Sequence, residues 1–433
     1  MDYDLVVIGA GWAGFNAAIR AKGLGLKVAL IDKAELGGTC LNRGCIPTKA
    51  LIQSAKIYSL CKKAATFGVE TANPQVNFLK IQERKDKIVQ QLKNSMQFML
   101  GGIDFLNTTA EIISHQEVRA GDKILKTKFI LIATGSKPQE LKSIPFDGKK
   151  IISSDDALGL KEIPQKILII GGGVIGCEFA SLFSSLESEV TIVEIMPQLL
   201  PGIDKEVAKK LESIFKKKGI KVSINADAAT SKPQDYDMVL VCVGRTPYTS
   251  GLALEKIGVN LGKGKIIVDK YLKTNIPNIF AAGDSTGQIM LAHFAAYQGE
   301  IAAENIAHPD RMKEAKNRNV PNCIFTEPQI ATVGLKEEEL NPEEINVYKF
   351  DFLGSGMGRI LEETEGFIKV ISDKKSDEIL GASIIGPGAT ELIAILTVAI
   401  SNQLKASQIR NTIFAHPTLS ESIHQALKKE NGI

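Results

Sequence analysis

Two cysteines five residues apart are the residues of this chain best placed to do chemistry. Cys40 and Cys45 lie in the segment Gly37-Gly38-Thr39-Cys40-Leu41-Asn42-Arg43-Gly44-Cys45-Ile46-Pro47-Thr48-Lys49, and a helix is predicted to begin near Pro47. A thiol at a helix N-terminus and near Arg or Lys has a lowered pKa, so it is a thiolate at neutral pH. Such a pair can cycle between dithiol and disulfide by thiol–disulfide exchange.

A structural disulfide and half of a metal site are the alternatives for this pair. The N-terminus has no basic segment followed by a cleavage site, so secretion and structural disulfides are not expected. A metal site needs a second Cys or His pair at ligand spacing, which the sequence lacks, and we predict no metal. The other cysteines are expected to be buried in the core: Cys61, Cys177, Cys242 and Cys323.

One of the five histidines is a candidate acid–base group. Thiol–disulfide exchange needs a base near pH 7 to take the thiol proton and an acid to return it, and histidine suits both tasks. His416 precedes Glu421 by five residues, about one helical turn, and that carboxylate can hold one ring nitrogen as a donor. The alternative for a single histidine is a side chain satisfied inside the core.

Two glycine-rich segments have the spacing G-x-G-x-x-G. Each follows a short apolar run, precedes a predicted helix, and has an acidic residue 23 positions after its first glycine, which is typical of dinucleotide-binding βαβ units. The glycines allow a tight turn, a close approach of pyrophosphate, and close packing of helix on strand. The two sets are Gly9, Gly11, Gly14 and Asp32, and Gly171, Gly173, Gly176 and Glu194.

The acidic residues indicate which nucleotides bind. Asp32 and Glu194 can accept hydrogen bonds from a ribose 2′-hydroxyl, whereas a 2′-phosphate would be repelled, so the second site favours NAD over NADP. Two dinucleotide sites in one chain suggest a flavin dinucleotide, FAD, that exchanges electrons with NAD. The alternative is two glycine turns without a ligand. Trp12, inside the first loop, is expected to pack over the turn.

These residues require elements that hold them together. The series of strand, glycine loop, helix and strand occurs twice in the chain, and this repeat predicts an α/β fold with two Rossmann-like domains. Three apolar strands end in glycine: 129–133 before Thr134-Gly135, 238–243 before Gly244, and 279–282 before Gly283-Asp284. The third is expected to return to the first domain, with a helix over 285–305. The second copy has 25 residues where the first has 33 for its β-meander, so a shortened meander is predicted there.

The last part of the chain changes character after about Asn319. Strand-like runs at 349–353, 366–371 and 379–385 alternate with an apolar helix over 391–404, which predicts an α+β domain. That helix suits a subunit interface and an ordinary core equally. The predicted segments are 1–145 (first domain), 146–264 (second domain), 265–318 (return to the first) and 319–433 (C-terminal domain).

Composition excludes several classes of protein. The 433 residues carry a net charge of +3, too small to argue for a nucleic-acid or membrane partner. The longest uncharged stretch, 5–19, is shorter than the roughly 20 residues of a spanning helix and rich in glycine. We expect a cytoplasmic protein.

The cysteine segment, both glycine loops, Ala282-Gly283-Asp284 and His416-Pro417-Thr418-Leu419-Ser420-Glu421 together resemble the pyridine-nucleotide–disulfide oxidoreductases. The resemblance runs in order over residues 4–427. It implies an FAD domain holding Gly38, Thr39, Thr134, Gly135, Gly283 and Asp284, an NAD domain holding Gly244, and a C-terminal dimerisation domain.

The resemblance also implies a role for each reactive residue. Cys45 would lie against the flavin, Cys40 would meet the substrate, and Lys49 would pair with Glu178 near the flavin N5. In relatives the histidine reaches the disulfide of the partner subunit, which implies a homodimer. The family usually has a second histidine where this chain has Phe414, which leaves the local packing or proton route open.

The implied activity is oxidation of protein-bound dihydrolipoamide, with NAD as acceptor. The implied partner is a lipoyl-bearing acyltransferase or carrier protein. One alternative is another NAD(P)H-dependent disulfide reductase of the family, although no cysteine follows Cys323 to supply extra C-terminal thiols. A non-catalytic flavin-bound sensor or scaffold is the other alternative, and a scaffold would need none of these reactive residues.

Overall fold

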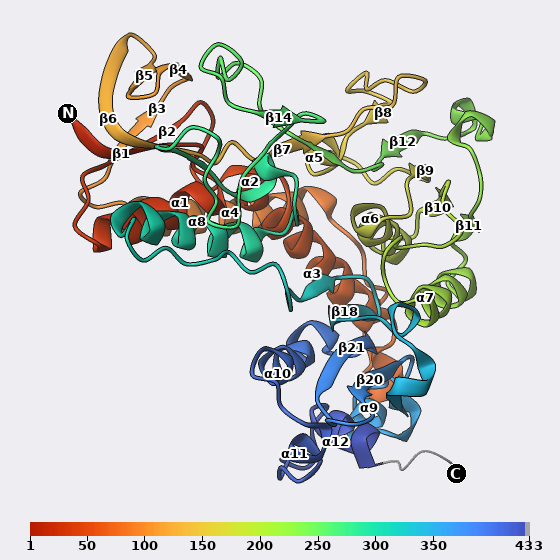
Figure 1. Ribbon diagram of the computed structural model, residues 1–433. Helices are drawn as coiled ribbons and strands as arrows, with labels where there is room; N and C mark the ends of the chain where they lie inside the picture. Colours follow the sequence, from red (N-terminus) through yellow and green to blue (C-terminus); the bar gives the residue numbers. More distant parts are fainter. Residues whose placement is uncertain (429–433) are drawn as a thin grey trace.

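Three sheets organise the computed structural model, which describes residues 1–428. The predicted C-terminal segment extends to 433, so its last five residues lie outside the described part. In Figure 1 the first sheet and its helices lie at the upper left, the second sheet at the upper right, and the C-terminal sheet below them. The expected fold class, two Rossmann-like domains and a C-terminal α+β domain, is confirmed.

The first sheet has the strand order β3-β2-β1-β6-β5-β4, with β16 paired to β6. The apolar runs form fully buried central strands that pair in parallel, as expected for strands covered on both faces. Strands β4, β5 and β6 form the antiparallel meander. The bounds are β1 (Tyr3–Ile8), β2 (Val28–Asp32), β3 (Asp104–Asn107), β4 (Ala110–Ser114), β5 (Glu117–Ala120), β6 (Lys123–Ile132) and β16 (Ile279–Ala281).

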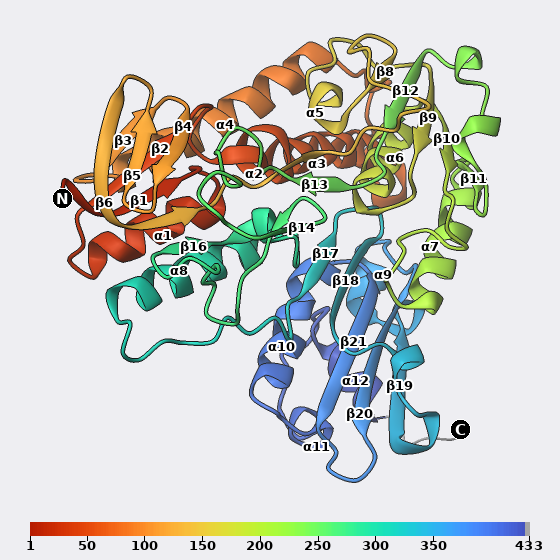
Figure 2. The ribbon, with the colours of Figure 1, turned by 45° about the horizontal axis from the view of Figure 1, so that its top comes forward.

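Helices α1 (Trp12–Gly23) and α8 (Ala292–Ala307) pack on each other beneath this sheet (Figure 2). Because β16 pairs with β6, the chain returns to the first sheet after the second domain. The expected helix over 285–305 begins late, at Ala292. Gly283–Thr286 form a 3₁₀ turn that ends at Gly287, whose φ of +59° cannot continue a right-handed helix.

The second sheet is parallel, with the order β11-β10-β9-β12-β8. In the described residues between β11 and β12 the chain forms two 3₁₀ turns, Ala228–Thr230 and Pro233–Asp235, in place of a meander. The meander of the second domain, predicted from the residue count to be shortened, is therefore replaced entirely by these two turns. The bounds are β8 (Ile151–Ile152), α5 (Ser154–Ala157), β9 (Lys166–Ile170), α6 (Val174–Ser185), β10 (Glu189–Val193), α7 (Lys205–Lys217), β11 (Lys221–Ser223) and β12 (Met238–Val241).

The C-terminal sheet is antiparallel, with the order β17-β18-β21-β20-β19. Helix α10 packs on β18 and β21, and α12 packs on β19 and β20. The bounds are β17 (Asn322–Ile324), β18 (Gln329–Gly334), β19 (Ile345–Asp351), α9 (Gly356–Ile360), β20 (Phe367–Asp373), β21 (Ile379–Gly386), α10 (Ala389–Ser401), α11 (Ala406–Arg410) and α12 (Glu421–Lys428).

The expected apolar helix is α10, and it is buried on only one side. Leu392 and Leu396 face the sheet, whereas Val398 is 59% exposed. One face therefore belongs to the core of its own chain, and the other is left for solvent or a second subunit.

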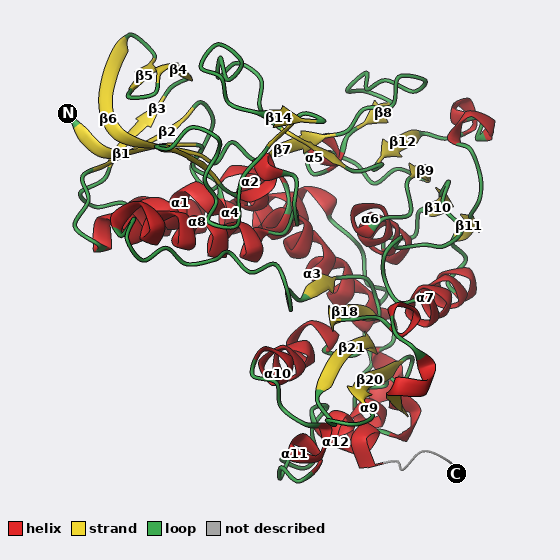
Figure 3. Cartoon of the chain, viewed as in Figure 1, coloured by secondary structure: helices red, strands yellow, loops and turns green. Residues whose placement is uncertain are grey.

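The long helix α3 connects the three parts (Figure 3). Its residues Leu51 and Ala55 belong to one hydrophobic cluster with Phe179 of α6 and Ile385 of the C-terminal sheet. The remaining elements are short or connect the domains: α2 (Gly38–Arg43), α3 (Cys45–Lys62), α4 (Phe78–Met99), the antiparallel pair β7 (Ser136–Pro138) and β13 (Arg245–Pro247), and the hairpin β14 (Leu261–Gly262) and β15 (Lys265–Ile266).

Candidate active site

Each of the two glycine loops forms a tight turn. No residue other than glycine fits at the first and third glycine positions of the turn. Gly9 has a φ of +105°, and a Cβ there would lie 2.2 Å from Ala133 O; a Cβ on Gly14 would lie 1.8 Å from Gly9 O. In the second loop Gly171 also has a φ of +105°, and a Cβ on Gly176 would lie 2.0 Å from Gly171 O. These contacts bring the helix and the neighbouring strand end close together.

The middle glycine of each loop faces open space. A Cβ on Gly11 would meet its nearest atom, Gly38 Cα, at 3.9 Å, and a Cβ on Gly173 would meet nothing within 4 Å. Helices α1 and α6 begin directly after these glycines, with no side-chain cap and no acidic residue in the first turn. Open space beside uncapped N–H groups fits the pyrophosphates of FAD and NAD.

The two acidic residues hold the glycine turns by the same pair of hydrogen bonds. Asp32 Oδ2 accepts from Ala10 N at 2.6 Å and Oδ1 from Ala34 N at 2.8 Å. Glu194 Oε2 accepts from Gly172 N at 2.6 Å and Oε1 from Met196 N at 2.7 Å. Each oxygen keeps a further lone pair for a ribose hydroxyl, so these residues can fix the loop and bind the nucleotide at once.

The strand-end residues 134–135 and 244 lie beside these loops. Thr134 Oγ1 donates to Tyr248 O at 2.6 Å, and Gly135 O accepts from Tyr248 N at 2.8 Å. Gly244, with a φ of +120°, accepts from Gln139 N at 3.0 Å. These bonds connect the strand ends of the first and second domains.

Two further glycines pack closely around the first loop. A Cβ on Gly38 would lie 2.6 Å from Gly11 Cα, and one on Gly283 would lie 3.0 Å from Ala13 Cβ. Gly283 N donates to the buried Gln298 Oε1 at 2.8 Å. The cysteine segment and the 283–284 turn therefore both lie against the start of α1.

Asp284 is part of a hydrogen-bonded chain that sequence patterns do not single out. Its Oδ2 accepts from Ser136 Oγ at 2.5 Å, and Ser136 Oγ accepts from Arg245 Nε at 2.8 Å. Arg245 also donates to Ser136 O at 3.0 Å. Ser136 and Arg245 thus hold one oxygen of Asp284 in place, and in the described chain the other oxygen makes no hydrogen bond and can accept one from a ligand hydroxyl.

The cysteine pair lies at the junction of two helices. Cys40 and Thr39 are in α2, and Cys45 is the first residue of α3, so this helix begins two residues before the predicted Pro47. A helix accepts proline throughout its first turn, where the N–H has no intrahelical partner. Cys45 therefore lies at the positive end of the α3 dipole, which favours a thiolate.

The two thiols are free and hydrogen-bonded to each other. This bond, with the nearby Lys49 ammonium, lowers the pKa of Cys45 from its usual value to about 7, against the opposing effects of burial and of Glu178. The same bond and burial raise the pKa of Cys40, although the Trp12 indole N–H acts in the opposite direction. Trp12 Nε1 is buried without a partner in regular hydrogen-bond geometry. When the pair loses its first proton, near neutral pH, the negative charge therefore lies on Cys45 and the remaining proton on Cys40.

Lys49 and Glu178 form an ion pair one helical turn after Cys45. Lys49 Nζ lies 2.8 Å from Glu178 Oε1 and 2.7 Å from Oε2. The Glu178 side chain is 4% exposed, and its Oε1 also accepts from Phe325 N at 2.9 Å. Lys49 Nζ lies 4.7 Å from the centre of the Phe325 ring. The ion pair thus joins α3, α6 and the loop after β17 beside the cysteines.

His416 and Glu421 form a second polar pair at the far end of the molecule. His416 Nδ1 lies 2.9 Å from Glu421 Oε2, and the histidine side chain is 77% exposed. Thr418 N donates to Glu421 Oε1 at 3.3 Å, and the pKa of Glu421 is lowered first by the bond to His416 and then by this backbone bond. With Nδ1 held by a carboxylate, Nε2 is free to take a proton.

The structure does not bring His416 to the cysteines of its own chain. In Figures 1 and 2 α12 lies in the lower domain and α2 in the upper one, and no hydrogen bond or ion pair among residues 1–428 joins them. A second subunit must therefore supply the base if the two groups are to act together.

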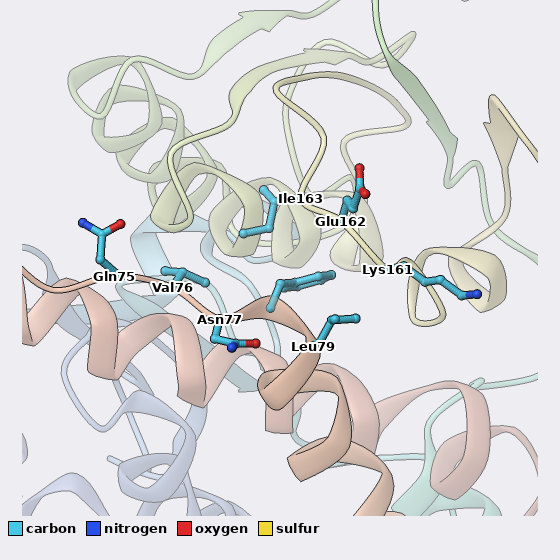
Figure 4. Close-up of a pocket in the computed structure, with 8 residues that line it drawn as sticks. Gln75, Val76, Asn77, Leu79, Lys161, Glu162 and Ile163 are labelled. Carbon is cyan, nitrogen blue, oxygen red and sulfur yellow. The ribbon is translucent and has the colours of Figure 1, made fainter.

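The remaining candidates have no reactive partner. Cys177 and Cys242 are buried as expected, whereas Cys61, next to the last residue of α3, and Cys323, in the edge strand β17, are only half-buried. Within the described residues no cluster of three or more His, Cys, Asp or Glu could hold a metal ion. A surface pocket between 75–79 and 161–163 contains none of the predicted site residues (Figure 4).

Comparison with known proteins agrees with this geometry. Residues 3–299 match the family described as pyridine nucleotide-disulphide oxidoreductase, and residues 320–427 match its dimerisation domain. Across residues 1–428 no helix has both the length and the apolar character needed to cross a membrane.

The relatives cover the whole chain. A dihydrolipoyl dehydrogenase of Bacillus subtilis is 38% identical over 99% of both chains. One from Chlamydia trachomatis is 40% identical over 97% of this chain and 95% of its own. Among solved structures, the HOCl-induced flavoprotein disulfide reductase RclA from Escherichia coli has a TM-score of 0.87 and 30% identity, covering 98% of this chain and 99% of that one.

Proposed function

Because this chain belongs to the pyridine nucleotide-disulphide oxidoreductase family, we propose that it oxidises protein-bound dihydrolipoamide, with a second copy of itself completing each active site. The chain is a flavin-dependent disulfide oxidoreductase that uses FAD and NAD, and it forms a homodimer through its C-terminal domain. The substrate, its carrier and the roles of individual residues are what the proposal adds.

One observation carries the choice of substrate. Relatives named dihydrolipoyl dehydrogenase match nearly the whole chain at 36–40% identity, and the dithiol and the exposed His–Glu pair are the two groups that oxidation of a dithiol needs. The partner we propose is a lipoyl-bearing acyltransferase or carrier protein. A pair of free catalytic thiols suits the reducing cytoplasm, where we place the enzyme.

In the proposed reaction, the partner subunit's His416 takes a proton from one substrate thiol through Nε2, and Glu421 stabilises the resulting imidazolium. The substrate thiolate attacks Cys40 Sγ in the Cys40–Cys45 disulfide, and Cys45 leaves as a thiolate. Its pKa of about 7 makes it the better leaving group of the two.

The second substrate thiol then displaces Cys40. His416 returns its proton to Cys40 as that sulfur leaves, then takes the proton of the second thiol and releases it to solvent, and lipoamide closes to its disulfide. The substrate has lost two electrons and two protons, and the enzyme disulfide has become a pair of free cysteines, the state in which the structure holds Cys40 and Cys45. Bound FAD would supply the two-electron relay from this dithiol to NAD.

We propose that Lys49 and Glu178 keep the Cys45 side of the pair charged and in place. The positive charge of Lys49 favours the Cys45 thiolate, and Glu178 fixes the ammonium at that position. The segments 1–145 and 265–318 would bind FAD, 146–264 would bind NAD, and 319–433 would form the dimer contact.

Anaerobic titration tests the proposal. Dihydrolipoamide added to purified FAD-loaded protein should produce the long-wavelength thiolate–flavin absorbance, and NAD added next should remove it and form NADH. The Cys45→Ser variant should show no such band. A wild-type protein that gives neither the band nor NADH refutes dihydrolipoamide as the substrate.

A further inference from the structure

The loop that carries His416 has almost no support from its own backbone. Residues 411–417 are exposed except Phe414, which is half-buried. In the described chain, no backbone N–H between Ile413 and His416 donates to another backbone group. The position of this loop must therefore be determined by the contacts that its side chains make.

Two side chains of the loop contact α12. The two residues of α12 that they contact are three positions apart. His416 bonds to Glu421, and Phe414 stacks on His424, with ring centres 5.5 Å apart and an interplanar angle of 16°. Residues i and i+3 of a helix lie on the same face. Glu421 and His424 thus form one surface on which alternate residues of the loop rest.

His424 is itself held from the other side. Its Nε2 lies 2.9 Å from Arg410 O, the last residue of α11. The imidazole therefore contacts both ends of the connection from α11 to His416: Arg410 before the loop and Phe414 within it. The family's usual histidine at position 414 is replaced here by an apolar ring that packs on this imidazole and on the C-terminal core.

We propose that His424 is a positioning residue for the acid–base pair, holding Phe414 and the 411–417 loop on α12 so that His416 stays bonded to Glu421. His424 does not touch the substrate in this proposal. The inference rests on the proposed function, because it assigns His424 a task in the reaction of His416.

The test compares three variants of the FAD-loaded dimer. His424→Ala removes the stack and the bond to Arg410 O. His424→Phe keeps an aromatic ring for Phe414. His115→Ala is the matched control, because His115 Nε2 also lies near a backbone carbonyl, Ile257 O at 3.2 Å, but in the first domain.

Three readouts are measured on each variant: kcat for dihydrolipoamide, the rate of flavin reduction by NADH, and the rate of tryptic cleavage after Arg410. His424→Ala should lower kcat for dihydrolipoamide about fivefold, the scale of one lost aromatic stack, while the rate of flavin reduction by NADH stays at the wild-type value. Trypsin should cleave after Arg410 several-fold faster in His424→Ala, because the loop is released. His424→Phe should restore kcat to near wild type, because the stack is kept, and should slow cleavage after Arg410 only in part, because phenylalanine cannot bond to Arg410 O. His115→Ala should change none of the three values.

Each outcome decides between a positioning role and a merely structural one. Slower flavin reduction by NADH in His424→Ala, or no rescue by His424→Phe, would overturn the proposal, as would unchanged cleavage after Arg410. A wild-type enzyme inactive with dihydrolipoamide refutes the substrate, and the cleavage rates then still decide whether His424 holds the loop.

Discussion

The pKa of Cys45 should move in opposite directions when the two members of the adjacent ion pair are replaced. Replacing Lys49 by Met removes a cation that favours the thiolate and leaves the buried Glu178 carboxylate unpaired; both changes oppose a negative charge on sulfur. Glu178→Gln removes an anion that disfavours the thiolate. We expect Lys49→Met to raise the pKa of Cys45 and Glu178→Gln to lower it.

The structure sets the size of the effect. A pKa of about 7 in place of an ordinary value near 9 means that the surroundings favour the thiolate by about 3 kcal/mol. The hydrogen bond from Cys40 is the largest cause, and Lys49 is the strongest charge acting in the same direction. An opposite charge nearby lowers an acid's pKa by about 1–3 units, so losing Lys49 should raise the midpoint to roughly 8 or above.

The assay is a pH titration of the thiolate–flavin absorbance in a Cys40→Ser background. Serine cannot form a disulfide with Cys45, but its hydroxyl keeps a donor there. The band should grow with rising pH, because deprotonation creates the thiolate. With a midpoint of 7 about nine-tenths of the thiol is ionised at pH 8, and with a midpoint of 9 only about one-tenth.

Lys56→Met is the control for this experiment. Lys56 lies in the same helix and pairs with Glu363 at 2.8 Å, so the variant removes an equivalent charge away from the cysteines. The reasoning is wrong if Lys49→Met and Glu178→Gln shift the midpoint in the same direction, or if Lys49→Met shifts it no more than Lys56→Met does.

Three other predictions concern the base, the NAD loop and the domain contact. His416→Gln should lower kcat for dihydrolipoamide about 10²–10⁴-fold and spare flavin reduction by NADH, and equal losses in both half-reactions would contradict its role as base. Gly173→Ala should weaken NAD binding without lowering the melting temperature, whereas Gly176→Ala should lower it, because only the second Cβ meets protein atoms; calorimetry of both variants decides. Lys369→Met should lower the unfolding free energy by about 3–5 kcal/mol in a urea titration, because the fully buried Asp204 carboxylate loses the ammonium 2.7 Å away. A loss below about 1 kcal/mol would show that Asp204 does not need the charge of Lys369 for stability.

The glycine loops and the cysteine pair could be predicted from the sequence because local geometry dictates their residues. A φ of +105° and carbonyl contacts near 2 Å exclude every side chain, so the spacing of Gly9 and Gly14 already indicates the turn. The same holds for the second copy. The 23-residue interval to Asp32 and Glu194 likewise places each carboxylate at the end of the next strand.

Contacts between distant segments could not be predicted in this way. Ser136, Arg245 and Asp284 are up to 148 residues apart in sequence, and only the pairing of β7 with β13 and of β16 with β6 brings them together. Nor does any pattern show that Phe414 stacks on His424, because aromatic contacts depend on where α11 and α12 pack.

Helix starts were the least predictable local feature. Proline is acceptable at any residue of a first turn, so Pro47 could not distinguish a start at 47 from the observed start at Cys45. The difference is important, because it places the sulfur of Cys45 on the first residue of the helix.

The distance between His416 and the dithiol within one chain has a genetic consequence. If each site combines Cys40 and Cys45 of one subunit with His416 of the other, a Cys40→Ser chain and a His416→Gln chain are each inactive alone but restore one another when they pair. One site of such a mixed dimer is intact, and the other carries both defects. With random pairing of equal amounts, half of the dimers are mixed and activity returns to about a quarter of the wild-type value. Two alleles with damage at opposite ends of the gene therefore restore together the enzyme activity that neither gives alone.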